Sequence, residues 1–266
     1  MSITKKSGKK AGKAWEAAWE SFLEYVTETD QILNLSMTGI RNLEGMVRLK
    51  EVLKRDPKEI EKAKVVEALA LAERDRGFPL HIAHSLVSLW SALESAVLRF
   101  APEWLALHPA VLEGPAFAKV KVPAALLNAE LRIESMVAVL DEASKQMASS
   151  LKPGIGRFTA LLEVVGVPVT VSKEVRDRLY ELSKLRNLIV HQFGVADERF
   201  VRECPTVKAT AGERVMVSYA DYRTYGRAAR DFAIVVLQAA NRSEIALSKK
   251  PKSITVGASP SKTKKR

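Results

Sequence analysis

The sequence has 266 residues and a single cysteine, Cys204. One cysteine cannot form a disulfide within the chain, which is typical of a reducing compartment. No apolar run approaches the roughly 20 residues that a membrane-spanning helix needs. The basic N-terminus is not followed by the apolar segment of a secretory signal, because Glu16, Glu20 and Glu24 interrupt the first apolar stretch. We therefore expect a cytoplasmic protein without membrane contact.

The sequence also lacks a P-loop, a dinucleotide-binding fingerprint and a nucleophile elbow. His81 and His84 have the H-x-x-H spacing of zinc ligands, but two ligands do not make a zinc site and no cysteine or acidic cluster lies nearby. We expect neither a metal nor a cofactor. Tyr219, Tyr222 and Tyr225 recur every third residue and could stack bases, although packing is the simpler interpretation.

Positive charge is concentrated at the two ends of the chain. Residues 1–13 and 249–266 carry twelve lysines and arginines and no acids, so the net charge of +11 leaves −1 for residues 14–248. We expect both ends to be disordered basic tails. Such tails fit loose binding of RNA or another polyanion, and they equally fit solubilising ends.

Between the tails, the composition is that of an ordinary globular protein, with 47% hydrophobic and 27% charged residues. We expect residues 14–76 to form an N-terminal helical segment packed on the core, and residues 77–248 to form the main domain. Apolar residues recur at helical spacing along most of the chain. This spacing predicts helices over residues 14–26, 40–53, 57–72, 80–100, 124–149, 158–165, 172–191 and 221–247.

Two features refine this mainly helical fold class. The helix over residues 80–100 is apolar around much of its circumference, which predicts a central position, and Pro102 should begin an irregular stretch. Val207 and Val217 belong to two short segments that alternate apolar and polar residues on either side of Gly212. This alternation predicts a small β-hairpin after the helix over residues 172–191.

The segment RNLIVH, Arg186 to His191, carries the best candidate for chemistry. Asn187 and His191 are four residues apart and share a helix face. Arg186 lies about 140° from His191 around an ideal helix, a gap that its long stem can close. Arginine suits phosphate oxygens and histidine transfers protons near neutral pH, so the group suits cleavage of RNA without a metal. Alternatively, such residues only cap carbonyls or pair with acids at a helix end.

The stretch LYELSKLRNLIVHQFGVADERF, residues 179–200, resembles the HEPN superfamily of helical RNases and nucleotide-linked modules. Its signature is Arg-Asn-x3-His near the end of a helix, here Arg186, Asn187 and His191. Gly194 and Asp197 resemble the turn that follows the motif in one branch. The stretch SLVSLWSALESAVLRF, residues 85–100, resembles the earlier helix of that family.

This resemblance covers about residues 77–241 and implies a HEPN-like helical bundle. It further implies a metal-independent endoribonuclease of toxin or antiviral-defence type, in which Arg186 binds phosphate and His191 is the general acid or base. Members of the family usually work as homodimers whose motifs face each other, which implies a homodimer and an antitoxin or defence-system partner protein here. Some active members have a lysine four residues after the acid of the earlier helix, whereas this chain has Leu98 there.

That acid is Glu94, which lies among apolar residues of its helix. A buried carboxylate needs a cationic partner, for which Arg186 is the first candidate and Arg99 and Arg132 are alternatives. The pair could orient the site or serve the fold alone. The alternative function is a non-catalytic HEPN-like module that binds protein or nucleic acid, in which Arg186 and His191 serve packing or dimerisation.

Overall fold

The protein is mainly α-helical, as the sequence predicts, in a computed structural model that describes residues 14–122, 132–147 and 154–248. The two expected basic tails and the predicted helix start at residue 124 lie outside the described residues. The elements in chain order are η1 (Ala14–Glu16), α1 (Ala17–Arg41), α2 (Met46–Val52), α3 (Pro57–Asp75), α4 (Pro79–Leu107), η2 (Pro109–Glu113), η3 (Pro115–Phe117), α5 (Arg132–Met147), α6 (Gly156–Val164), α7 (Lys173–Gln192), α8 (Glu198–Glu203) and α9 (Tyr219–Ser248).

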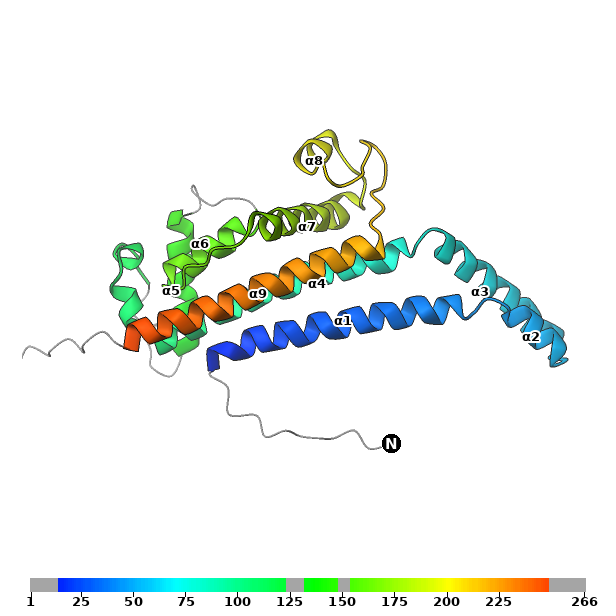
Figure 1. The fold of residues 1–266 in the computed structure, drawn as a ribbon, viewed down its shortest axis with the longest axis horizontal. Helices are drawn as coiled ribbons and strands as arrows, with labels where there is room; N and C mark the ends of the chain where they lie inside the picture. Colours follow the sequence, from blue (N-terminus) through cyan, green and yellow to red (C-terminus); the bar gives the residue numbers. More distant parts are fainter. Residues whose placement is uncertain (1–13, 123–131, 148–153, 249–266) are drawn as a thin grey trace, which may run out of the picture.

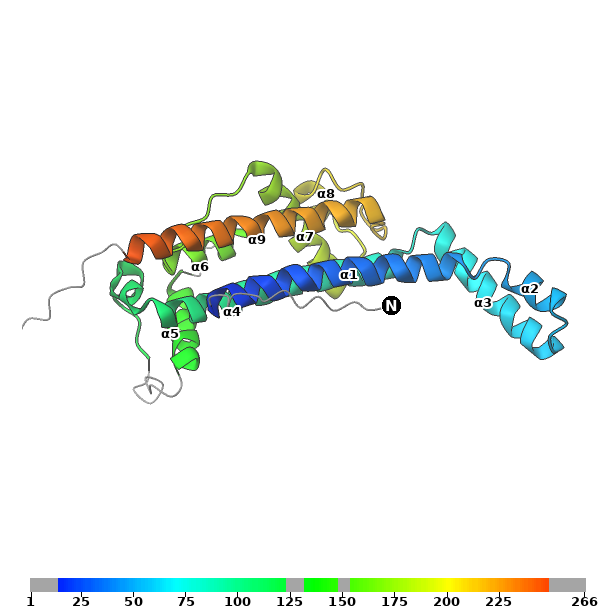
Figure 2. The same cartoon turned by 60° about the horizontal axis from the view of Figure 1, so that its bottom comes forward.

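Three long helices form the body of the molecule. α1, α4 and α9 run alongside one another, and α7 lies across α4 and α9 (Figure 1). α5 and α6 pack on the C-terminal half of α4. α2 and α3 project beyond the N-terminus of α4 as an arm (Figures 1 and 2). No described helix combines the length and the apolar composition that a bilayer crossing requires.

α4 is the centre of the hydrophobic core, as its pattern predicts. Leu86, Leu93 and Phe100 are each fully buried. The expected break at Pro102 is wrong, because α4 continues through this proline to Leu107. Proline removes one backbone hydrogen bond from a helix, but the turn that follows buries Trp104 completely. The apolar area removed from water there offsets the lost bond.

η1 and α1 contribute one tryptophan each to the same core. Trp15 and Trp19 are fully buried, and their rings lie 5.9 and 6.0 Å from the ring of Phe100. Tyr222 and Tyr225 of α9 are also buried. The packing interpretation of these aromatic residues is therefore confirmed, and burial leaves these two tyrosines no face for a nucleic-acid base.

The predicted β-hairpin is wrong, since the described residues between α8 and α9 form no strand. The segment instead pairs with the chain that follows α7, through one isolated bridge between Val195 and Arg214. Ala196 donates its N–H to the Glu213 carbonyl at 2.8 Å. Val207 and Val217 are half-buried against the helices. The segment is extended and packs one side on the helices. Every second side chain therefore faces the helices, which gives the same alternation as a β-strand.

We expect the two α4 leucines at positions 93 and 98 to respond differently to truncation. Leu93 is fully buried and Leu98 is 56% exposed. Leu93→Ala should lower the free energy of unfolding by about 2–5 kcal/mol, because it leaves a cavity in the core. Leu98→Ala should change it by less than about 0.5 kcal/mol. Chemical denaturation followed by circular dichroism measures both, and equal losses would contradict this placement of α4.

Candidate functional site

The ends of α7 are fixed by local sequence. Ser172 caps the N-terminus, as predicted, by accepting a hydrogen bond from the Val175 N–H at 3.2 Å. At the other end Phe193 adopts the left-handed conformation with φ of 54°. Gly194, also left-handed, donates its N–H to the Leu188 carbonyl at 3.0 Å. The helix therefore stays regular through His191, and the motif residues have defined directions.

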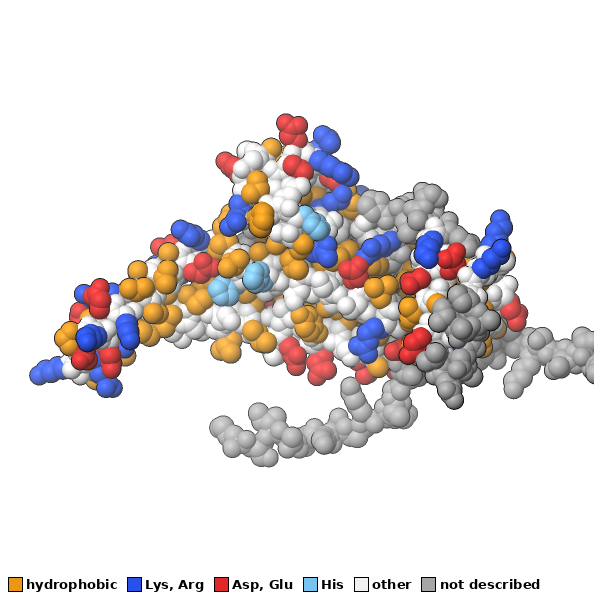
Figure 3. Space-filling model, turned by 180° about the vertical axis from the view of Figure 1, so that it is seen from behind, with side chains coloured by type: hydrophobic (Ala, Val, Ile, Leu, Met, Phe, Trp, Pro, Cys, Tyr) orange, Lys and Arg blue, Asp and Glu red, His pale blue; other side chains and the backbone are white. Residues whose placement is uncertain are grey.

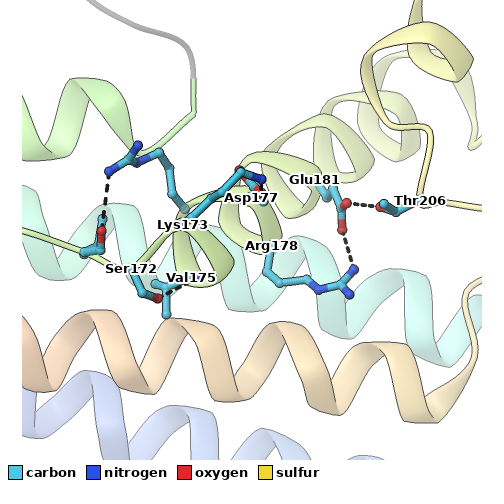
Figure 4. A network of polar contacts seen from close by, with 9 residues as sticks. Ser172, Lys173, Val175, Asp177, Arg178, Glu181 and Thr206 are labelled. Atoms are coloured by element: carbon cyan, nitrogen blue, oxygen red, sulfur yellow. Dashed lines mark hydrogen bonds and ion pairs between the residues drawn. The ribbon is translucent and has the colours of Figure 1, made fainter.

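A buried carboxylate fixes the rotation of α7 against its neighbours. Glu181 is only 5% exposed and accepts hydrogen bonds from Arg178 at 3.0 Å and from the Thr206 hydroxyl (Figure 4). The Tyr225 hydroxyl of α9 also donates to it at 3.4 Å. Burial, together with the charge of Glu181, raises the pKa of Tyr225. These contacts join α7, α9 and the segment between α8 and α9.

The C-terminal half of α7 borders a cavity of about 260 Å³. Lys184, Asn187 and His191 line it from α7, and the side chains of Asn187 and His191 are exposed. The other wall is α8, which Asp197 caps by accepting a hydrogen bond from the Phe200 N–H at 2.6 Å. An imidazole and an amide thus stand together at a solvent-accessible hollow, as the four-residue spacing predicts.

Two cations of this cavity are partly neutralised by one acid. Glu203 accepts from Lys184 Nζ at 2.5 Å and from Arg199 Nε at 2.9 Å. The hydrogen bonds from Lys184 and then Arg199 lower the pKa of Glu203 to about 2. The carboxylate is therefore ionised at neutral pH, and the positive potential that the cavity offers an anion is smaller than two free cations would give.

Arg186 points to another side of α7. It is half-buried and does not line the cavity, but its Nη1 donates to Asn187 Oδ1 at 3.0 Å. Its Nε is buried and has no hydrogen-bond partner among the described residues. Burial and the positive charge of Arg186 both lower the pKa of Arg157. The guanidinium of Arg186 therefore lies between the amide that borders the cavity and a second arginine.

The predicted partner of Glu94 is wrong. Glu94 forms an ion pair with Arg157 of α6, and not with Arg186, Arg99 or Arg132. The side chain of Glu94 is 25% exposed, so the expectation of partial burial is confirmed. Arg132 donates instead to the carbonyl of Ala106. Because Arg157 also feels the charge of Arg186, Glu94 is joined to the motif through one intermediate arginine.

Sequence reasoning missed several residues around the motif. Lys184 lies three and seven residues before Asn187 and His191, so the helical period could have placed it on their face. Arg199 and Glu203 lie on α8, a helix of six residues that the pattern did not indicate. Phe193 is 80% exposed at the end of the motif helix, and an exposed ring in the left-handed conformation is uncommon.

Among the histidines of the H-x-x-H pair, His81 contacts Glu73 across 3.3 Å. The described residues contain no group of three or more potential ligands that could hold a metal ion. No family model, no curated protein and no solved structure matches the chain. Its function is therefore inferred from the residues of this chain.

The low pKa of Glu203 predicts a pH dependence of stability. The folded pKa of about 2 lies below the ordinary value of 4.5. The ion pairs of Glu203 therefore stabilise the fold fully above pH 4.5 and less as the pH falls toward 2. Glu203→Gln should flatten the dependence of the unfolding free energy on pH in this window, whereas Glu198→Gln, an exposed change on the same helix, should not. Thermal unfolding at a series of pH values measures this, and parallel curves for the wild type and Glu203→Gln would refute it.

Proposed function

We propose that this protein is a metal-independent endoribonuclease of the toxin or defence type, with a HEPN-like helical bundle. The observation that carries the proposal is the position of His191. Its side chain is exposed beside Asn187 at the cavity between α7 and α8, and Asn187 is bonded to the guanidinium of Arg186. A proton-transfer group and a permanent cation thus stand on either side of one amide.

The reaction needs no metal at these residues. The RNA 2′-OH attacks its own phosphorus, its proton passes to a base, and the leaving 5′ oxygen takes a proton from an acid. His191 serves one of these proton transfers at the cavity. The positive charge of Arg186, on the other side of Asn187 from the cavity, stabilises the negative charge of the phosphorane from that distance. We propose that a second copy of the motif, in a homodimer, supplies the other transfer, as the family resemblance implies.

The energetic cost of Arg186 supports a functional role. The buried Nε of Arg186 has no hydrogen-bond partner among the described residues, and the like charge of Arg157 opposes that of Arg186. Unpaired buried donors and neighbouring like charges each cost stability in general. Such costs are common where a group has to meet a ligand. The exposed ring of Phe193 is a suitable platform for a base of single-stranded RNA.

We expect His191→Ala to lose RNA cleavage in the presence of EDTA. Removing a general acid or base typically lowers the rate by about 10²–10⁴-fold. The helical circular-dichroism signal should stay unchanged, because the side chain is exposed. His84→Ala, which removes a histidine of α4, is the matched control and should cleave like the wild type. Equal cleavage by His191→Ala would remove this residue from the mechanism.

A non-catalytic HEPN-like module that binds protein or nucleic acid is the second candidate. It is favoured by the neutralisation of Lys184 and Arg199 by Glu203, and by the half-burial of Arg186. Under this candidate Arg186 holds the bundle together through the packing of its half-buried side chain.

Arg186→Met separates the two candidates, because methionine keeps much of the apolar stem and removes the charge. The enzyme proposal predicts cleavage reduced at least as much as binding, with an unfolding free energy that is unchanged or higher. A gain of about 1 kcal/mol is the scale for relieving one unsatisfied buried group. Chemical denaturation, an RNA cleavage assay and an RNA-binding assay of the same preparation measure these three quantities. A clear loss of stability would favour the structural role.

A further inference from the structure

α3, in the projecting arm, is apolar on two opposite faces. The inner face includes Ala63 and Ala70, which are buried, and Glu67 on this face accepts the Val47 N–H of α2 at 2.8 Å. On the opposite face lie Val65 and Leu69, which are 58% and 66% exposed. A helix needs one apolar face to pack on α2, so the second face calls for another explanation.

The exposed residues form one continuous stripe. Val65, Ala68, Leu69 and Ala72 are all exposed and have the spacing i, i+3, i+4 and i+7 of a single helix face. We call these four residues the outer stripe. Hydrophobic side chains are visible along the arm in the space-filling view (Figure 3). Apolar side chains gathered in this way on a protein surface mark an interaction site.

The charges that flank the outer stripe are arranged with opposite signs at its two ends. Lys62 and Glu73 lie on one side of the stripe, and Lys64 and Asp75 lie on the other. The members of each pair are eleven residues apart, which is about three helical turns. Along the sequence, the midpoint between Lys62 and Glu73 lies just before Ala68, and the midpoint between Lys64 and Asp75 lies just after Leu69. The two pairs of charges are therefore centred on the middle of the stripe.

This arrangement is complementary to itself only in the antiparallel orientation. If a second α3 runs in the opposite direction across the stripe, Lys62 of one copy meets Glu73 of the other, and Lys64 meets Asp75, on both sides of a two-fold axis. A parallel copy would place lysine beside lysine and acid beside acid. Within the chain Asp75 meets Arg74 at 2.9 Å and Lys64 meets Glu61 at 3.3 Å, in exposed contacts that are weak in water. The side chain of Glu73 is 25% exposed and contacts His81.

We propose that the outer stripe binds the same stripe of a second copy of this chain, antiparallel and two-fold symmetric. The small side chains of Ala68 and Ala72 let the two helices approach closely, while Val65 and Leu69 are removed from water. One pair of helices about 30 Å long is a small interface, so we expect association at micromolar concentration. This inference names a contact surface outside the motif and goes beyond the proposed nuclease activity.

The first test compares two leucines that are exposed to a similar extent. Leu69 lies at the centre of the stripe, and Leu35 of α1 is 72% exposed outside it. In sedimentation velocity of the full chain at micromolar concentration, the wild type and Leu35→Lys should associate alike. Leu69→Lys should raise the dissociation constant of the contact through the outer stripe at least tenfold, while any association through the motif persists. A monomeric wild type, or an unchanged dissociation constant for Leu69→Lys, would overturn the proposal.

The second test establishes the orientation. One variant carries Lys62→Glu and Lys64→Glu, and the other carries Glu73→Lys and Asp75→Lys. Each variant alone should dissociate, because an antiparallel pair then brings like charges together, and an equal mixture should form a heterodimer. Native mass spectrometry distinguishes the species, and circular dichroism checks that each variant is folded. Folded variants that fail to associate on mixing would overturn the antiparallel arrangement. If the wild type is monomeric and binds neutral lipid vesicles, the stripe is a membrane-binding surface and the proposal is overturned.

Discussion

The rotation of α7 about its own axis is the constraint on which the candidate site depends. Leu182 and Leu185 are fully buried against the bundle, and the buried carboxylate of Glu181 binds groups from α9 and from the segment before it. A rotation that exposed these residues would lose apolar burial and leave a charge without partners. Since the inner face is fixed in this way, Asn187 and His191 are held at the cavity, and Arg186 is held toward α6.

Charged side chains gather where α4, α6 and α7 meet. Glu94 pairs with Arg157, and Arg157 lies close enough to Arg186 for the two positive charges to oppose each other. Glu94 thus pairs with one of these two guanidinium groups. An anion such as a phosphodiester would relieve this repulsion, which connects the electrostatics of the α4, α6 and α7 junction with the proposed substrate.

The sequence predicts the helices well where apolar residues recur at the helical period over several turns, as in α4 and α7. It also places Asn187 and His191 together, because a spacing of four needs no tertiary information. The break at Pro102 and the β-hairpin are wrong for one reason, since in both cases packing on the bundle overrides a local signal. Arg157, the partner of Glu94, could not be found, because its helix meets α4 only through the tertiary fold.

The central claim is that a phosphodiester reaches the face of α7 that carries His191. The most direct test is an NMR titration with a short 2′-O-methyl RNA, which binds like a substrate but has no free 2′-OH for attack. We predict that the imidazole resonances of His191 and the amide resonances of Asn187 shift in a saturable way, while those of His84 stay in place. Saturable RNA binding that leaves the resonances of His191 and Asn187 unchanged would contradict the account.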